Sequence, residues 1–271
     1  SFGGDGYVSV EVAPSLAHDG PGTEAAARAL HEQIDRPNLM VKIPGTVEGL
    51  AAIRRMIAEG RNINVTLIFS LDRYQQVMDA YIDGLEEYAG TVDADLAHVA
   101  SVASFFISRV DSEVDARLDA IGTPEALALR GKAAIAQAKL AYHAFRHTFS
   151  GARWEALAAD GAVVQRPLWA STSTKNPAYP DTLYVDELIG PDTVNTLPDA
   201  TIEAFAHHGT SARTIDEGVS HAELVWRQLA EVGVDMDDVA DKLERDGVAS
   251  FQKSFDDLLE ALAAKADELR N

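Results

Sequence analysis

Short apolar runs alternate along this chain with longer stretches in which apolar residues recur at every third or fourth position. The short runs are rich in Val, Ile, Phe and Thr, as β-strands are, and the longer stretches have the period of amphipathic helices. Strand, helix, strand, helix is the order of a parallel sheet with helical crossovers. The predicted strands are residues 7–12, 39–44, 63–69, 99–108, 163–171 and 193–198.

Capping residues mark helix starts between these strands. Thr123 is followed by Pro124 and Glu125, an N-cap and then proline at the first helical position, which predicts one long helix running towards His147. Other helices are predicted at residues 24–34, 47–59 and 71–88, and from residues 199, 214 and 235 onward.

Each predicted strand has one apolar and one polar side, because successive side chains point to opposite faces. An open doubly wound sheet buries both faces and should be apolar on both, and no glycine-rich dinucleotide fingerprint follows the first strand. Polar side chains that converge from several strands instead predict an α/β fold of the (β/α)8 barrel type. The polar sides carry Glu11, Lys42, Asn64, Thr66, Ser104 and Ser171.

Size and composition fit this fold. The chain has 271 residues, of which 46% are hydrophobic, and barrels of this length form single domains. We therefore expect one barrel domain over residues 1–271, although length alone also allows two smaller domains. The sequence contains no cysteine, which excludes disulfides, thiolate metal ligands and cysteine nucleophiles. The apolar runs are strand-sized and no basic stretch precedes one at the start, so we expect no membrane span, no signal peptide and a cytoplasmic location.

The formal net charge is −20. A nucleic-acid surface needs clustered Lys and Arg, whereas the basic residues here are scattered, so we expect no nucleic-acid partner. The same charge repels small anions at long range. A phosphate ester could therefore bind only where the site supplies a local positive group.

Lys42 lies in the middle of the predicted strand at residues 39–44. Burial disfavours the charged form of a lysine, so a buried amine tends to lose its proton and becomes a nucleophile towards carbonyl carbons. The alternative is a side chain whose apolar stem reaches water while the amine keeps its charge.

Glu11 and Thr66 lie on the polar sides of neighbouring predicted strands. When an amine attacks a ketone, the carbinolamine must lose water, which needs a proton donor and acceptor within reach. These two side chains could hold the water that carries the proton. Alternatively, Glu11 forms a purely structural ion pair with Lys42, and Thr66 is there because threonine favours strands.

Five segments resemble successive strand motifs of transaldolase, particularly its actinobacterial form. The resemblance runs in order from Asp5 to the carboxyl terminus, with helical stretches of suitable length between the motifs. A single motif would be only suggestive, but five in register are highly specific. They are VSVEV at residues 8–12, VKIPGT at 41–46, NVTLIFS at 64–70, SFFISR at 104–109 and LWAST at 168–172.

The resemblance implies a class I aldolase-type (β/α)8 barrel in which Lys42 forms a Schiff base with a ketose phosphate. A dihydroxyacetone unit would pass between sedoheptulose 7-phosphate or fructose 6-phosphate and an aldose phosphate, either glyceraldehyde 3-phosphate or erythrose 4-phosphate. The resemblance also implies that Glu11 and Thr66 position the catalytic water. Asn64 and Ser104 bind the dihydroxyacetone part, and Phe106 lines the pocket. Neither a metal nor an organic cofactor is implied.

The resemblance also supplies candidates for the phosphate site. Arg109 and Ser171 match an arginine and a serine that follow the family's sixth and seventh strands. Many family members then read Ala-Ser-Phe-Arg-Asn, whereas this chain reads ASTSTKN at residues 170–176. Lys175 would have to replace the arginine across a two-residue insertion, and a lysine acts as a point charge and not as a bidentate fork.

The first predicted strand, with Glu11, matches the family's third. The first two strands are missing, along with the strand-one aspartate that serves the family as general acid and base for cleavage. A barrel without them has exposed edges, so we expect the chain to be N-terminally incomplete, with a preceding segment or another chain completing the barrel. Without that part, full transaldolase activity should be lost even if Lys42 still traps a carbonyl compound.

Three functions therefore stay open from the sequence. The first is dihydroxyacetone transfer, and the second is a related imine-forming aldolase that releases its product, acting on a substrate such as fructose 6-phosphate. The third is a non-catalytic barrel fragment that binds sugar phosphate or a partner chain.

Overall fold

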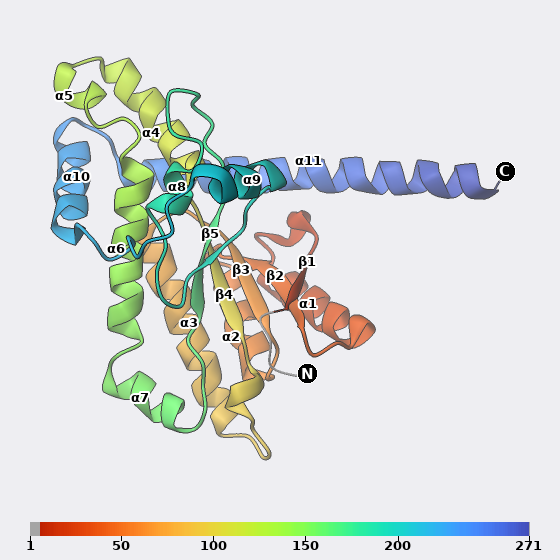
Figure 1. Cartoon of the computed structure of the whole chain (residues 1–271). Helices are drawn as coiled ribbons and strands as arrows, with labels where there is room; N and C mark the ends of the chain where they lie inside the picture. The colour runs from red at the N-terminus through yellow and green to blue at the C-terminus, as the bar shows by residue number, and fades with distance from the viewer. Residues whose placement is uncertain (1–5, 271) are drawn as a thin grey trace.

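The computed structural model describes residues 6–270 and contains one curled sheet of parallel strands (Figure 1). Its six strands are hydrogen-bonded in sequence order, which is the arrangement of a barrel and not of a doubly wound sheet. A strand lies within each of the six predicted runs, but the runs at 99–108, 163–171 and 193–198 extend beyond their strands. The strands are β1 (Val8–Glu11), β2 (Leu39–Pro44), β3 (Ile63–Ile68), β4 (Ser101–Phe106), β5 (Arg166–Ala170) and β6 (Val194–Asn195).

Helices connect the strands and cover the outer side of the sheet. Two are one-turn 3-10 helices, η1 (Pro14–Leu16) and η2 (Leu96–His98). The α-helices are α1 (Gly20–Ile34), α2 (Gly49–Ala58), α3 (Leu71–Ala89), α4 (Ser108–Ile121), α5 (Pro124–Leu127), α6 (Ala133–Thr148), α7 (Ala152–Ala159), α8 (Leu183–Asp186), α9 (Asp199–His208), α10 (Val219–Glu231) and α11 (Met236–Arg270).

The main core lies between the outer face of the sheet and helices α1, α2 and α3. Val41, Ile43 and Val65 point to this side and are fully buried, as expected for the face that helices cover in a parallel sheet. At Gly84, the absence of a side chain lets α3 approach α2 closely, since a Cβ there would lie 2.7 Å from the backbone oxygen of Arg54. Helices thus cover the apolar sides of the strands, and the opposite sides face the concave interior.

Two helix predictions are wrong. The helix predicted from residue 124 to 147 does start at the cap Thr123, but it ends at the end of α5. Gly131 then has a φ of +70°, a backbone conformation that side-chain-bearing residues rarely adopt, and α6 follows as a separate helix. The helix predicted from Thr214 begins later, after Gly218, because the Thr214 hydroxyl instead donates to the backbone oxygen of Asp186 at 2.6 Å.

The two edges of the sheet do not meet within residues 6–270. β1 pairs only with β2 and β6 only with β5, so the described strands form a curled part of a barrel. Val8 at the first edge is 60% exposed. Among residues 6–270, no helix is both long and apolar enough to cross a membrane.

Candidate functional site

The concave side of the sheet encloses a hollow of about 730 Å³. Side chains from all six strands reach it, because every second residue of each strand points inward. The hollow is therefore lined by the inner sides of the strands, where polar side chains alternate with apolar ones such as Met40, Val102 and Leu168. Its polar lining includes Ser9, Lys42, Asn64, Thr66, Ser104 and Asn195.

Lys42 and Glu11 lie opposite each other on β2 and β1, where the strand register pairs them. Lys42 Nζ is 3.4 Å from Glu11 Oε2, and the two side chains are only 23% and 28% exposed. Burial raises the pKa of Glu11, although the ammonium of Lys42 opposes this. The amine thus faces the interior beside a carboxyl group that takes up a proton more readily than usual. The structural ion pair and the proton-transfer pair considered above share this geometry.

Asn64 is fixed from both sides on the next strand, where it pairs in register with Lys42. Its Nδ2 donates to Ser9 Oγ at 3.0 Å, and Ser104 Oγ donates to its Oδ1 at 2.8 Å. These two hydrogen bonds link β1, β3 and β4 across the inner face. Ser9 was not predicted as a site residue, although it lies two residues before Glu11 and so on the same side of β1.

The hydroxyl of Thr66 is buried two residues further along β3. Its Oγ1 has no hydrogen-bond partner within the described part of the chain. A buried hydroxyl without a partner is unfavourable by about 1–3 kcal/mol. A water or a substrate oxygen bound in the hollow could supply the missing hydrogen bond.

Phe106 and Arg109 lie at the carboxyl end of β4 and the start of α4. The Phe106 ring packs against Phe69 with centroids 5.0 Å apart, and the Arg109 guanidinium carbon lies 5.2 Å from the Phe106 centroid. Burial lowers the pKa of Arg109. Over residues 6–270, no carboxylate lies within ion-pairing distance of this guanidinium, whose hydrogen-bond donors could therefore serve an anion.

Ser171 and Lys175 both follow β5, but their surroundings differ. Ser171 has a φ of +58° and its Oγ is 2.9 Å from that of Ser108, next to Arg109 in sequence. Lys175 is exposed, and its Nζ donates to Ser173 Oγ at 2.7 Å. It lines a separate hollow of about 280 Å³ with three aspartates of α4. Neither Lys175 nor Ser171 is among the residues that line the concave hollow, which β5 reaches through Arg166, Leu168 and Ala170.

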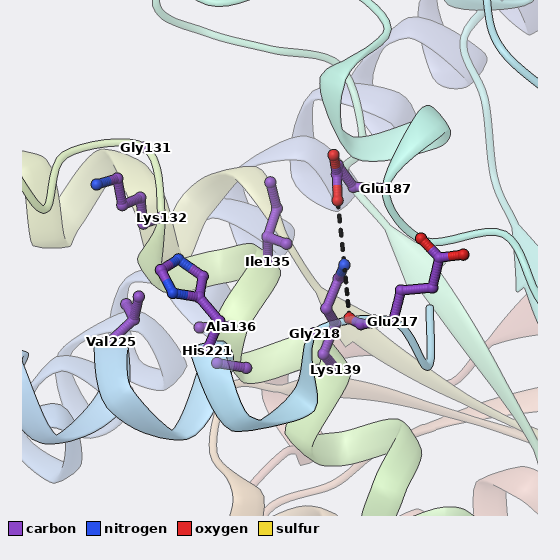
Figure 2. A pocket seen from close by; sticks show the side chains of 11 residues that line it. Gly131, Lys132, Ile135, Ala136, Lys139, Glu187, Glu217, Gly218, His221 and Val225 are labelled. Atoms are coloured by element: carbon purple, nitrogen blue, oxygen red, sulfur yellow. Dashed lines mark hydrogen bonds and ion pairs between the residues drawn. The ribbon is translucent and has the colours of Figure 1, made fainter. Parts of the chain in front are cut away.

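A second lysine, Lys139 on α6, is more deeply buried than Lys42. It lines a cavity of about 250 Å³ between α6 and α10 (Figure 2). Its Nζ donates to Glu187 Oε2 at 3.1 Å and to the backbone oxygen of Glu217 at 3.2 Å. Both lysines are thus largely buried and paired with a glutamate. Lys139 also donates to a backbone oxygen, whereas Lys42 lines the concave hollow.

The sequence pattern does not indicate one aromatic residue that lies near the Lys42 amine. Phe251, on α11, has its ring centroid 5.5 Å from Lys42 Nζ and 5.7 Å from the guanidinium carbon of Arg109. Alternation along strands could not point to it, because it reaches the site from a helix much later in the chain. Its apolar spacing within that helix predicts only a packed face.

Comparison with known proteins identifies relatives over nearly the whole chain. The family model described as "Transaldolase/Fructose-6-phosphate aldolase" matches residues 1–262. A transaldolase of Parafrankia sp. (strain EAN1pec) is 58% identical over 263 residues, which are 97% of this chain and 71% of that protein.

Two further actinobacterial proteins show the same extent of similarity. The transaldolase of Frankia alni is 56% identical over 264 residues, 97% of this chain and 71% of the relative. The transaldolase of Mycolicibacterium smegmatis is 53% identical over 268 residues, 98% of this chain and 72% of the relative. Identity at this level extends far beyond the strand motifs.

Proposed function

The chain belongs to the transaldolase family, and from this we propose that it transfers a dihydroxyacetone unit through a Schiff base on Lys42. The reaction would convert sedoheptulose 7-phosphate and glyceraldehyde 3-phosphate into erythrose 4-phosphate and fructose 6-phosphate, in the non-oxidative pentose phosphate pathway. One observation carries the assignment to Lys42. Its amine faces the concave hollow 3.4 Å from the Glu11 carboxyl group.

The chemistry follows from these two neighbours. The amine attacks the C2 carbonyl of the ketose phosphate, and the carbinolamine loses water to give an iminium ion. Glu11 has a raised pKa, so it is suited to passing a proton to the leaving hydroxyl and taking one back. The water between them would bind at the unpartnered hydroxyl of Thr66. A base, which the family supplies as an aspartate on its first strand, then takes the proton of the C4 hydroxyl; electrons from the breaking C3–C4 bond flow into the iminium, and the aldose phosphate leaves.

Asn64 and Ser104 are proposed to bind the dihydroxyacetone part. Their side chains are already joined by a hydrogen bond of 2.8 Å, and the link to Ser9 holds the amide in one orientation. A preoriented amide and hydroxyl lose little freedom when the sugar hydroxyls arrive. Phe106 would form the apolar wall of the same pocket.

Arg109 is the proposed phosphate ligand, with Ser171 beside it. A chain of net charge −20 needs a local cation to bind a sugar phosphate, and Arg109 is half-buried with no carboxylate partner in residues 6–270. A guanidinium binds phosphate through paired hydrogen bonds. Lys175 stays a candidate only if its exposed loop moves towards the hollow when substrate binds.

Open edges support a further part of the proposal. β1 and β6 each present one unpaired edge within the described residues, and such edges normally receive another strand or a cover. We propose that additional strands, from further polypeptide or another chain, close a single barrel domain in the cytoplasm. Slow hydrogen exchange at the β1 amides that point away from β2 would support this closure, whereas fast exchange at these amides in the functional protein would contradict it.

Trapping with borohydride tests the role of Lys42. The protein is incubated with fructose 6-phosphate, reduced, and analysed by intact mass and peptide mapping. We expect a covalent adduct on Lys42 that is absent from Lys42→Ala. Lys132→Ala is the matched control, because Lys132 is an exposed lysine beside the second cavity (Figure 2), and this variant should be trapped like the unmodified protein.

The adduct also separates the remaining functions. A three-carbon adduct shows that the C3–C4 bond was broken, whereas a six-carbon phosphate adduct shows imine formation without cleavage. Consumption of fructose 6-phosphate that depends on added erythrose 4-phosphate indicates transfer, and consumption without an acceptor indicates an aldolase of the fructose 6-phosphate type. No adduct at all, or an adduct that persists in Lys42→Ala, would refute the proposal.

A further inference from the structure

Helix α11 crosses the carboxyl-terminal end of the sheet and then extends beyond it (Figure 1). It packs against η1, which follows β1, against β3 itself, and against α4, which follows β4. The polar residues proposed above lie on the inner face below this end of the sheet. The first half of α11 therefore lies over this end of the sheet, close to Lys42.

Small and apolar residues bring α11 close to the strands. Leu243 and Gly247 are buried one turn apart, and Phe251 follows at the next turn on the same side. A Cβ at Gly247 would lie 2.9 Å from the Cδ2 atom of Leu67. The absence of a side chain at Gly247 thus sets how deeply the Phe251 ring reaches.

Two ion pairs also hold the first turns of α11 on α4. Arg117 pairs with Asp238 at 2.7 Å, and Glu113 pairs with Lys242 at 3.0 Å. Each such pair near the surface is worth little by itself. Together with the buried residues, they fix the helix in one position at the end of the sheet.

The Phe251 ring lies against both cations of the proposed site. Its centroid is 5.5 Å from Lys42 Nζ, 5.7 Å from the Arg109 guanidinium carbon and 6.3 Å from the Phe106 centroid. The ring is half-buried. It occupies space beside the amine that water would otherwise fill.

We propose that Phe251 is a positioning residue that shields the Lys42 imine from bulk water, an inference that rests on the proposed Schiff base. Hydrolysis of the iminium takes up one water, breaks the carbon–nitrogen bond and returns the amine and the ketone. A transferase must delay this reaction until an acceptor arrives. With an apolar ring on one side of the nitrogen, attack is restricted to water held at Glu11 and Thr66.

The lifetime of the imine tests this role. The imine is formed with dihydroxyacetone, which needs no bond cleavage and no phosphate site, then diluted and trapped with borohydride after increasing delays. We expect Phe251→Ala to shorten the lifetime severalfold, and Phe251→Leu, which keeps an apolar cover, to restore most of it. Leu258→Ala is the matched control, since Leu258 is exposed on the same helix, and it should leave the lifetime unchanged.

The outcomes distinguish this inference from the proposed function. If the unmodified protein forms no adduct, the role of Lys42 fails and the inference falls with it. If the adduct forms and its lifetime is the same in Phe251→Ala, the shielding role alone is refuted. Failure of Phe251→Leu to restore the lifetime, with an unfolding midpoint equal to that of Leu258→Ala, would likewise refute shielding by an apolar side chain.

Discussion

Asp111 is a buried carboxylate whose ionisation should oppose folding at neutral pH. It lies on α4 and accepts a hydrogen bond from the Ala134 amide at 2.8 Å and another from the Tyr184 hydroxyl at 2.7 Å. Burial nevertheless raises the pKa of Asp111 from 3.8 to about 6, with a further contribution from the charge of Asp115. The folded protein therefore holds a proton that the unfolded chain releases more easily.

The size of the effect follows from this difference. At about 1.4 kcal/mol for each pKa unit, the shift from 3.8 to about 6 corresponds to about 3 kcal/mol. Because the folded-state pKa is the higher one, this stability is present in full below pH 3.8 and is lost as the pH rises through about 6. About 2 kcal/mol of the loss falls between roughly pH 4.5 and 7.5.

Asp111→Asn removes the charge and keeps the shape. Its amide can accept from the Ala134 amide and donate to the Tyr184 oxygen. We compare the free energy of unfolding of the variant with that of the unmodified protein at each pH. We expect this difference to favour the variant by about 2 kcal/mol more at roughly pH 7.5 than at roughly pH 4.5. Urea unfolding at both pH values measures this, and Asp119→Asn, an exposed position on the same helix, should change stability little at either. A difference that is independent of pH would refute the reasoning.

Two further predictions concern α3. At Gly84, an alanine Cβ would lie 2.7 Å from Arg54 O and from Ile57 Cβ; overpacking of about 1–3 kcal/mol should outweigh the roughly 1 kcal/mol that alanine gains in a helix. Urea unfolding of Gly84→Ala should therefore show a loss, while Gly90→Ala, which meets only an ordinary contact at 3.5 Å, should change little. Ser70 Oγ accepts from Arg73 N at 3.1 Å as the N-cap, so Ser70→Ala should lower the free energy of unfolding by about 1 kcal/mol. Ser70→Asp keeps an acceptor and should restore it; equal losses in both would contradict a capping role.

The strands could be predicted from the sequence where their apolar sides meet helices. The run at residues 39–44 matches β2 at both ends, because a buried strand flanked by polar residues has clear limits. The run at 99–108 was predicted too long, since Ser108 already begins α4. A continuous apolar run does not show where a strand turns into the first turn of a helix, and α4 was missed for this reason.

The site could be predicted only as far as strand alternation determines it. Lys42 and Asn64 line the same hollow because each has the inward position of its strand, and Glu11 lies beside Lys42 in the strand register. Beyond Val65 the register of β3 shifts, and Leu67 has a φ of +58°, so alternation no longer gives the direction of Phe69, which packs on the inward-facing Phe106. Contacts made by loops and by α11 depend on tertiary packing, which local patterns do not contain.

Several groups that packing alone does not explain lie on or beside the inner face of the sheet. The outer face is apolar and covered by helices, whereas the inner face holds a half-buried ion pair and the Thr66 hydroxyl, and Arg109 lies beyond the carboxyl end of β4. Within residues 6–270 the hydroxyl has no hydrogen-bond partner and the guanidinium has no carboxylate partner. Packing alone would favour apolar residues at these positions, because partial burial of charge is weak evidence for stability. A water or a sugar hydroxyl could supply the hydrogen bond that Thr66 does not make, and a phosphate could bind the guanidinium. The presence of these groups on and beside one hollow is therefore better explained by binding and chemistry than by the needs of the fold.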